Sequence, residues 1–269
     1  MAYASNVDEY VDTWLANGIV DVRLDIPDYQ NTTWLANSKA KVITAVAKGI
    51  RVLWGVSSNA YNNVAYTITT ENWPIFRQAI LSAAQWAEDN GVYEFQIGNE
   101  EEFHCDRWNP DATMKVPQLI ANLKAVATEV KQIFTSGKVS YSCAHSYISD
   151  WCSGGKGDLD ILASNIYRGG SATEDPFNDN WKTEVHSLVN AFGVSGTSIT
   201  ELNLSYLNIN NYSTDEAVQA TAVTEMLDYI KASGIKRVYW YAWKNDEFGI
   251  VKNDGTYREL IWDSLLNSN

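Results

Sequence analysis

Two glutamates stand out in the sequence because each directly ends a short apolar segment. Glu100 closes the stretch EFQIGNE, where Asn99 precedes it, and Glu201 closes the stretch TSITE. Two carboxyl groups that face each other can divide two tasks, since one donates a proton while the other attacks carbon or activates water. This combination serves glycoside hydrolysis, provided that the fold brings the two segments together. As simple helix N-caps the two residues would be poor choices, because glutamate is not favoured at that position.

The acidic run continues beyond Glu100. We expect Glu101 and Glu102 to be solvated charges in a loop or at the rim of a cleft, where Glu102 would raise the proton affinity of Glu100 by repulsion. His104, Cys105 and Asp106 follow in the sequence. Together with the glutamates they could suggest a metal site, but no helical or CxxC spacing fixes the ligands. A solvated loop is the preferred interpretation, and we predict neither a metal nor a cofactor.

The elements that must position these residues follow a repeated pattern. An amphipathic helix ends at a glycine, and a short apolar, β-branched segment comes next. The glycines that end the predicted helices are Gly18, Gly49, Gly91, Gly137, Gly193 and Gly234. Glycine is the usual residue just past a helix because it adopts the left-handed conformation without penalty. Helices that alternate with short strands predict βα units and a parallel sheet.

Seven such strands, without a linker between them, predict one α/β domain over residues 1–269, a TIM-type (β/α)8 barrel. A doubly wound sheet would need a glycine-rich phosphate loop, and neither GxGxxG nor GxxxxGK[ST] is present. The chain opens with a predicted helix, so the first strand is either short, within residues 1–6, or absent. An open seam would expose sheet edges, which proteins normally cover or pair. Dimerisation across this seam is therefore a hypothesis.

In a barrel of this type, the active site lies at the carboxyl ends of the strands. Ionisable, amide and aromatic side chains gather at the ends of the predicted strands. They are Arg23, Asp25, Trp54, Ser57, Asn59, Asn99, Glu100, His145, Tyr147, Asn165, Tyr167, Glu201, Asn203, Trp240, Trp243 and Asp246. A purely structural barrel would not need so many polar groups at one rim.

The segments IGNE and ITE resemble the acid/base and nucleophile strands of clan A glycoside hydrolases, which are retaining (β/α)8 enzymes and include family 5. The resemblance extends over the whole chain, because VRLDIP, DILASNIYRG and VYWYAWKND are similar to further strands of that clan in the same order. In the clan the two glutamates end the fourth and seventh strands. The resemblance therefore implies that the first strand is the one that this sequence lacks.

The resemblance also implies roles for single residues. Glu201 would be the nucleophile, supported by Arg23 and Tyr167, and Glu100 would be the acid/base. Asn99 would bind the sugar 2-hydroxyl.

A Trp of the last strand or its loop would form the floor under the reacting sugar; Trp243 is the first choice and Trp240 the alternate. His145, Tyr147 and Trp54 are expected to contact substrate. The sequence departs from the clan at Asn-Glu-Glu, where Asn-Glu-Pro is frequent, and at His145 with Tyr147, which sit one strand early.

Composition limits the partners. A net charge of −13 argues against nucleic acid or an anionic membrane, whereas 11 Trp and 15 Tyr suit stacking on uncharged saccharides. No apolar run is long enough to span a bilayer, and the first residues do not resemble a signal peptide. The three cysteines form neither a CxxC pair nor an even framework.

These observations favour a retaining hydrolase that acts on a β-linked oligo- or polysaccharide. One alternative is a carbohydrate-binding barrel with little or no turnover, and another is a lyase or metal-dependent hydrolase on the same fold. Sugar, linkage and mode of attack depend on loop shape and are left open by the sequence.

Overall fold

The computed structural model describes residues 7–24, 26–58, 68–105, 113–169, 179–204, 215–244, 246 and 248–267. The strands of this part of the chain form one parallel sheet in sequence order. They are β1 (Asp21–Arg23), β2 (Arg51–Gly55), β3 (Glu94–Asn99), β4 (Lys138–Cys143), β5 (Ile161–Arg168), β6 (Thr197–Leu204) and β7 (Val238–Trp240). The predicted seven-stranded α/β fold of TIM type is confirmed. The predicted first strand, residues 1–6, lies outside the described residues.

The helices of the described residues are α1 (Val7–Ala16), α2 (Thr32–Ala47), α3 (Trp73–Asp89), α4 (Glu101–Cys105), α5 (Val116–Ile133), α6 (Ile148–Gly154), α7 (Asn180–Phe192), α8 (Glu216–Ser233) and α9 (Glu259–Asn267). None of them is both long and apolar enough to cross a membrane. Two short 3-10 helices, His145–Tyr147 and Val194–Gly196, follow β4 and precede β6.

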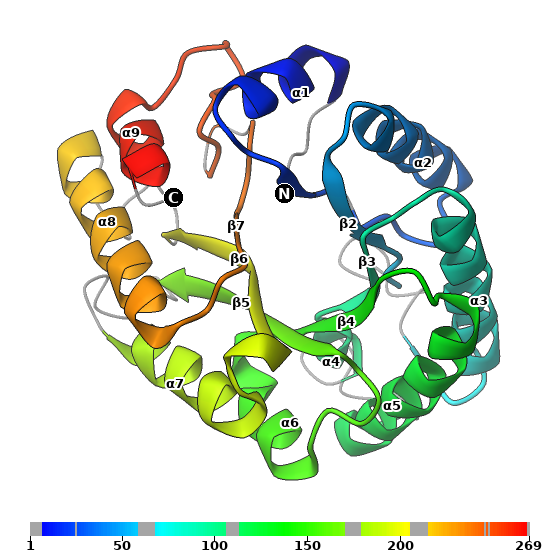
Figure 1. Ribbon diagram of the computed structural model, residues 1–269. Helices are drawn as coiled ribbons and strands as arrows, with labels where there is room; N and C mark the ends of the chain where they lie inside the picture. The colour runs from blue at the N-terminus through cyan, green and yellow to red at the C-terminus, as the bar shows by residue number, and fades with distance from the viewer. Residues whose placement is uncertain are drawn as a thin grey trace. The chain divides into compact units, whose positions relative to one another are not determined.

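The chain divides into two compact units, and the boundary falls inside β5. One unit comprises Asn6–Ser164, and the other contains Asn165–Asn269. Within the first unit, Figure 1 shows α2, α3 and α5 on the outer side of β2, β3 and β4. Within the second unit, α7 and α8 pack against β6. Each unit therefore repeats the arrangement of a parallel sheet covered by helices.

Five of the six glycines predicted to end helices have a positive φ, and Gly234 just past α8, with φ of 85°, is an example. The prediction for Gly137 is wrong, because α5 ends at Ile133 and Phe134 is its C-cap. The second helix begins at Thr32, where the Asn31 side chain accepts a hydrogen bond from the Trp34 N–H and caps it. The short helix α4 was not predicted, since its sequence reads as a polar loop.

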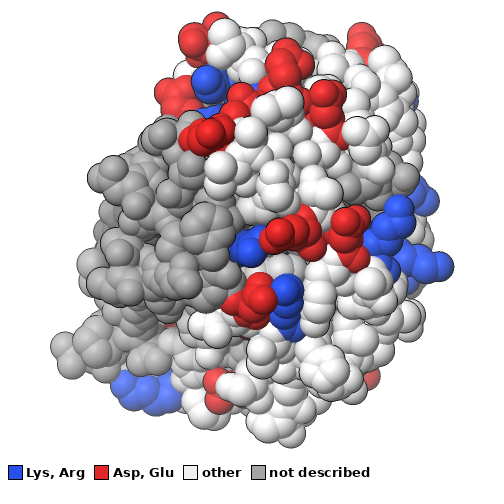
Figure 2. Space-filling view, turned by 90° about the vertical axis from the view of Figure 1, so that its left-hand side faces the viewer, with Lys and Arg blue, Asp and Glu red and all other residues white. Residues whose placement is uncertain are grey.

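Charge on the surface agrees with the composition. On the face drawn in Figure 2, Asp and Glu side chains occur in several groups, and most of the surface between them is uncharged. Lys and Arg side chains gather at the right-hand edge of this view, and others lie beside acidic side chains near its centre.

Candidate active site

The carboxyl end of β3 presents Asn99 and Glu100, both half-buried. Arg23, which ends β1 and is buried, binds this segment from the side. Its Nη2 donates to Asn99 Oδ1 at 2.7 Å, and its Nε donates to Gln96 Oε1 at 3.1 Å. A guanidinium group that holds the Asn99 amide oxygen fixes which way the amide points. Arg23 thus joins β1 to the end of β3, a contact that was not predicted, and its support of Glu201 stays a prediction.

Glu101 and Glu102 are not solvated, and the prediction of a solvent-exposed run is wrong. Both side chains are 0% exposed, and with Phe103, His104 and Cys105 they form α4. Buried carboxylates require hydrogen-bond partners, and the surrounding elements supply them. What reads in the sequence as a loop is a buried polar turn of helix beneath Glu100.

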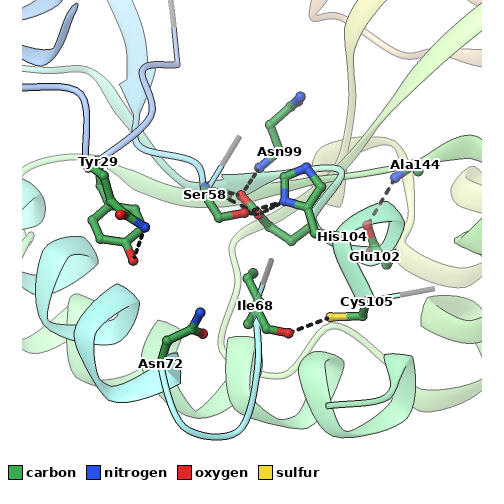
Figure 3. Close-up of polar contacts among 12 residues, drawn as sticks. Tyr29, Ser58, Ile68, Asn72, Asn99, Glu102, His104, Cys105 and Ala144 are labelled. Carbon is green, nitrogen blue, oxygen red and sulfur yellow. Dashed lines mark hydrogen bonds and ion pairs between the residues drawn. The ribbon is translucent and has the colours of Figure 1, made fainter. Parts of the chain in front are cut away.

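Glu101 is held by Ser58, which follows β2, and by His104 of α4; Figure 3 shows these two side chains pointing toward one another. Its carboxylate accepts a hydrogen bond from the Ser58 hydroxyl and lies 3.1 Å from His104 Nδ1. The same carboxylate accepts the backbone N–H of Asn99 at 3.2 Å. Burial raises the pKa of this carboxyl group, but the hydrogen bonds and the charge of His104 outweigh it, so that the pKa lies below its ordinary value. Glu101 is therefore ionised at neutral pH.

Glu102 occupies a different environment on the opposite side of α4. It accepts hydrogen bonds from Trp151 Nε1 at 2.6 Å and from the Tyr141 hydroxyl at 2.8 Å. Burial nevertheless raises its pKa to about 7, because no cation neutralises it among the groups that shift the pKa. Glu102 is thus not a fixed negative charge, and the expected repulsion of Glu100 would come from a group that is only partly ionised near neutral pH.

In the second unit, Glu201 lies in β6 and is 6% exposed. The hydroxyl of Tyr167, on β5, donates to Glu201 Oε2 at 2.5 Å. Beneath this pair, Thr200 Oγ1 donates to Asn165 Oδ1 at 2.9 Å, which ties the same two strands together. The predicted contact between Tyr167 and Glu201 is confirmed. The phenol therefore places a hydrogen-bond donor on one oxygen of this carboxylate.

The aromatic residues at the end of β7 and in the segment after it lie in different surroundings. Tyr241 and Phe248 pack against Tyr167, with ring centroids 6.2 and 6.1 Å away. Trp243, by contrast, is buried against Tyr257 and Trp262 at 6.4 and 5.4 Å. Trp240 is half-buried and donates its indole N–H to the Phe248 carbonyl at 3.3 Å. The rings that pack on Tyr167, the partner of Glu201, are therefore those of Tyr241 and Phe248, neither of which the sequence analysis selected.

Trp54 requires a correction. Its side chain is fully buried, and its indole N–H donates to Ser38 Oγ on α2 at 2.8 Å. The ring packs on Trp86 of α3, with centroids 4.8 Å apart. Side chains alternate between the two faces of a strand, so this residue belongs to the core under the helices and does not contact substrate.

The remaining candidates lie at strand ends or outside the described residues. His145 is exposed and begins the 3-10 helix after β4, and the Tyr147 ring contacts Phe103 with centroids 5.8 Å apart. Asn203 donates to the Phe248 carbonyl at 3.0 Å. Asp25 and Asn59 lie outside the described residues.

Tyr141, Ser58 and Gln96 were missed by the sequence analysis, because nothing in their local sequence separates a polar core group from an ordinary strand or loop residue. Trp151, for which sugar stacking was one expectation, is fully buried. The described residues contain no cluster of His, Cys, Asp and Glu that could hold a metal ion. Cys105, Cys143 and Cys152 form no disulfide in the described part of the chain.

Comparison with known proteins gives a likeness at the level of structure. No family model matches the sequence, and no curated protein matches it. A GH113 β-1,4-mannanase superposes with a TM-score of 0.68 at 12% identity, covering 99% of this chain and 94% of the other. A family 5 xyloglucanase from Paenibacillus pabuli gives 0.70 at 15% identity, covering 97% and 89%.

The catalytic domain of the major endoglucanase from Xanthomonas campestris pv. campestris gives a TM-score of 0.71 at 13% identity, covering 97% of this chain and 88% of the other. The chain has the fold of these glycoside hydrolases. The likeness covers nearly the whole chain, in agreement with the order of strands that the sequence predicted. At these identities the fold alone is shown, and the chemistry depends on the site residues.

Proposed function

We propose that the protein is a retaining glycoside hydrolase that cleaves a β-linked oligo- or polysaccharide. The observation that carries this proposal is the hydrogen bond from the Tyr167 hydroxyl to the buried Glu201 carboxylate at 2.5 Å. A buried carboxylate within β6 that has a phenol partner matches the role of a nucleophile, and the Asn99-Glu100 pair lies at the end of another strand of the same sheet. The structural neighbours named above are glycoside hydrolases, which supports the same reaction class.

In the proposed mechanism, the Glu201 carboxylate attacks the anomeric carbon and the bond to the leaving sugar breaks. Glu100 donates its proton to the departing oxygen, then removes a proton from the water that releases the glycosyl group from Glu201. This course requires the two carboxyl groups to approach within about 5 to 5.5 Å when substrate is bound. Asn99, oriented by Arg23, would bind the 2-hydroxyl of the reacting sugar.

For the floor of the reacting sugar we favour Tyr241 over Trp243 and Trp240. Tyr241 is half-buried and contacts Tyr167, whereas Trp243 is buried between two other rings. His145 and Tyr147 remain candidates for substrate contact further along the rim. Because the similar structures include a mannanase, a cellulase and a xyloglucanase, mannan, cellulose and xyloglucan are the first polymers to test.

The proposal is tested with aryl β-glycosides and these three polymers. We expect the wild type to release the phenol with retention of configuration in the first-formed product, observed by NMR. Glu201→Gln should lower kcat by at least about a thousandfold, because the covalent step loses its nucleophile. Glu259→Gln, at an exposed position on α9, is the matched control.

Near-full activity of Glu201→Gln would overturn the proposal. Binding of oligosaccharide by calorimetry without release of phenol would instead support a carbohydrate-binding barrel. Loss of activity on chelation would point to a metal-dependent hydrolase.

A further inference from the structure

The backbone around Glu100 is held at three successive N–H groups. The Asn99 N–H donates to Glu101 Oε1 at 3.2 Å, the Glu100 N–H donates to the Ser142 carbonyl at 2.8 Å, and the Glu101 N–H donates to the Tyr141 hydroxyl at 3.0 Å. Two of the three acceptors are side chains that are fully buried. The segment that presents the proposed acid/base is therefore fixed by side chains as well as by the sheet.

Glu100 needs such support because its backbone is in the left-handed region, with φ of 56°. A residue with a Cβ atom occupies this region at a cost on the order of 1 kcal/mol, and it persists there only when the surrounding structure imposes it. A left-handed residue turns the chain sharply between β3 and α4. The direction in which the Glu100 side chain leaves the strand thus depends on the hydrogen bonds to its two neighbours.

The two side-chain acceptors are themselves anchored. Glu101 accepts from the Ser58 hydroxyl and pairs with His104, and the Tyr141 hydroxyl donates to Glu102, which Trp151 also holds. The Tyr141 ring packs on Trp151 with centroids 5.0 Å apart. Because Glu101 and Tyr141 are themselves held in place, they can keep the Glu100 turn in one conformation when substrate binds.

Ser58, His104 and Glu101 do not form a second catalytic centre, although these residue types occur in hydrolytic triads. In a working triad the histidine uses one ring nitrogen for the nucleophile and the other for the acid. Here Ser58 Oγ and Glu101 Oε2 both approach His104 Nδ1. Ser58 is also only 1% exposed, so a substrate could not reach it. The cluster serves to hold the ionised Glu101 in place.

We propose that Tyr141 and Glu101 are positioning residues that aim Glu100 at the leaving oxygen of the substrate. This inference rests on the proposed function, because it assigns Glu100 the role of general acid. A general acid that is misaligned by a fraction of an ångström transfers its proton less efficiently. The rate falls most for substrates whose leaving group must be protonated. A leaving group that is a poor one needs the proton, whereas a good leaving group departs without it.

The test compares aryl glycosides of one sugar with poor and good leaving groups. Tyr141→Phe removes the hydroxyl and keeps the ring against Trp151. We expect its kcat/KM to fall about 10- to 100-fold for the poorest phenol and less than about threefold for the best, with KM nearly unchanged. A role limited to stability would lower both rates by the same factor, since it changes only the folded fraction.

Ser38→Ala is the matched control for the loss of a buried hydrogen bond. It removes the acceptor of Trp54 Nε1 in the core between α2 and β2, and it leaves in place the hydrogen bonds described above for the N–H groups of Asn99, Glu100 and Glu101. Its melting temperature should fall by about as much as that of Tyr141→Phe. Any loss of kcat/KM should be the same for all leaving groups. Should Tyr141→Phe fail to fold, Glu101→Met replaces it: this variant keeps the side-chain length and removes the acceptor of the Asn99 N–H.

The outcomes separate the two proposals. Equal losses for all leaving groups in the folded variant would overturn the positioning role while leaving the glycosidase intact. Absence of phenol release by the wild type, or full activity of Glu201→Gln, would overturn the proposed function and this inference with it.

Discussion

At the scale of single residues, the pKa values of the adjacent Glu101 and Glu102 shift in opposite directions, although their sequence surroundings are the same. Burial acts on both, but Glu101 has His104 and Ser58 beside it, whereas Glu102 faces uncharged donors. The pKa of Glu101 is lowered and that of Glu102 is raised to about 7. Neighbouring partners, and not the residue type, therefore decide which carboxyl group carries charge.

Glu102 should make folding stability depend on pH. Its pKa in the folded protein, about 7, lies above the ordinary value of 4.5, so the folded state binds the proton more tightly than the unfolded state. The resulting stability is complete below about pH 4.5 and is lost as the pH rises through 7, by up to about 3 kcal/mol. Glu102→Gln, which cannot ionise, should show a smaller loss of unfolding free energy between pH 5 and about 8 in denaturant titrations.

Glu259→Gln serves again as the control, because it removes an exposed carboxylate from α9. Its pH dependence should match that of the wild type. If Glu102→Gln and the wild type lose stability in parallel over this range, Glu102 is not the group responsible.

At the scale of elements, the corner between β3 and α4 depends on close packing at Gly98. A Cβ atom at this position would lie 2.9 Å from Glu101 Cγ and 3.0 Å from Tyr141 Cε2. Both neighbours are buried and hydrogen-bonded, so neither can move away freely. The glycine therefore allows Glu101 to fold back beneath the strand end.

Gly98→Ala should lower the free energy of unfolding by about 1 to 3 kcal/mol through this overpacking, measured by urea denaturation. It should also lower kcat, because Glu101 can no longer hold the Asn99 N–H. Gly154→Ala is a suitable control, since the nearest atom to its added methyl group is the flexible end of Lys124, 3.0 Å away. Equal stability of the Gly98→Ala variant and the wild type would contradict this view of the corner.

At the scale of the whole molecule, the proposed catalytic residues belong to different compact units. Glu100 lies in Asn6–Ser164 and Glu201 lies in Asn165–Asn269, and β5 runs from one unit into the other. In the described part of the chain, β1 and β7 end the sheet. The sequence predicts that the strand before β1 is short or absent, so the edge of the sheet at β1 is the one that could be open.

The hypothesis that a second copy covers this edge predicts a mass in solution about twice the 30.1 kDa of the chain. Light scattering over a range of concentrations measures this mass directly. Val22→Lys places a charge on β1 and should prevent dimerisation across this edge. The result can be interpreted only if the circular dichroism spectrum of the variant matches that of the wild type. A monomeric mass at all concentrations would count against the dimer.

The order of the strands and of the long helices between them could be predicted from the sequence, because helix-ending glycines and β-branched segments act locally; the short helices α4 and α6 could not. The end of β3 at Asn99 and Glu100 also followed from the length of the apolar run, whereas β6 continues three residues beyond Glu201, which was predicted to end it. The contact between Tyr167 and Glu201 was expected from the resemblance to clan A glycoside hydrolases.

Only the tertiary structure decided what each side chain meets. Trp54 lies in the core and Tyr241 lies beside Tyr167, although both are aromatic residues at strand ends. The charges of Glu101 and Glu102 depend on Ser58, His104, Tyr141 and Trp151. Ser58, Tyr141 and Trp151 are distant in sequence, and the sequence does not show that His104 contacts Glu101. Burial and hydrogen bonding are set by groups from several elements at once, so no local pattern could have specified them.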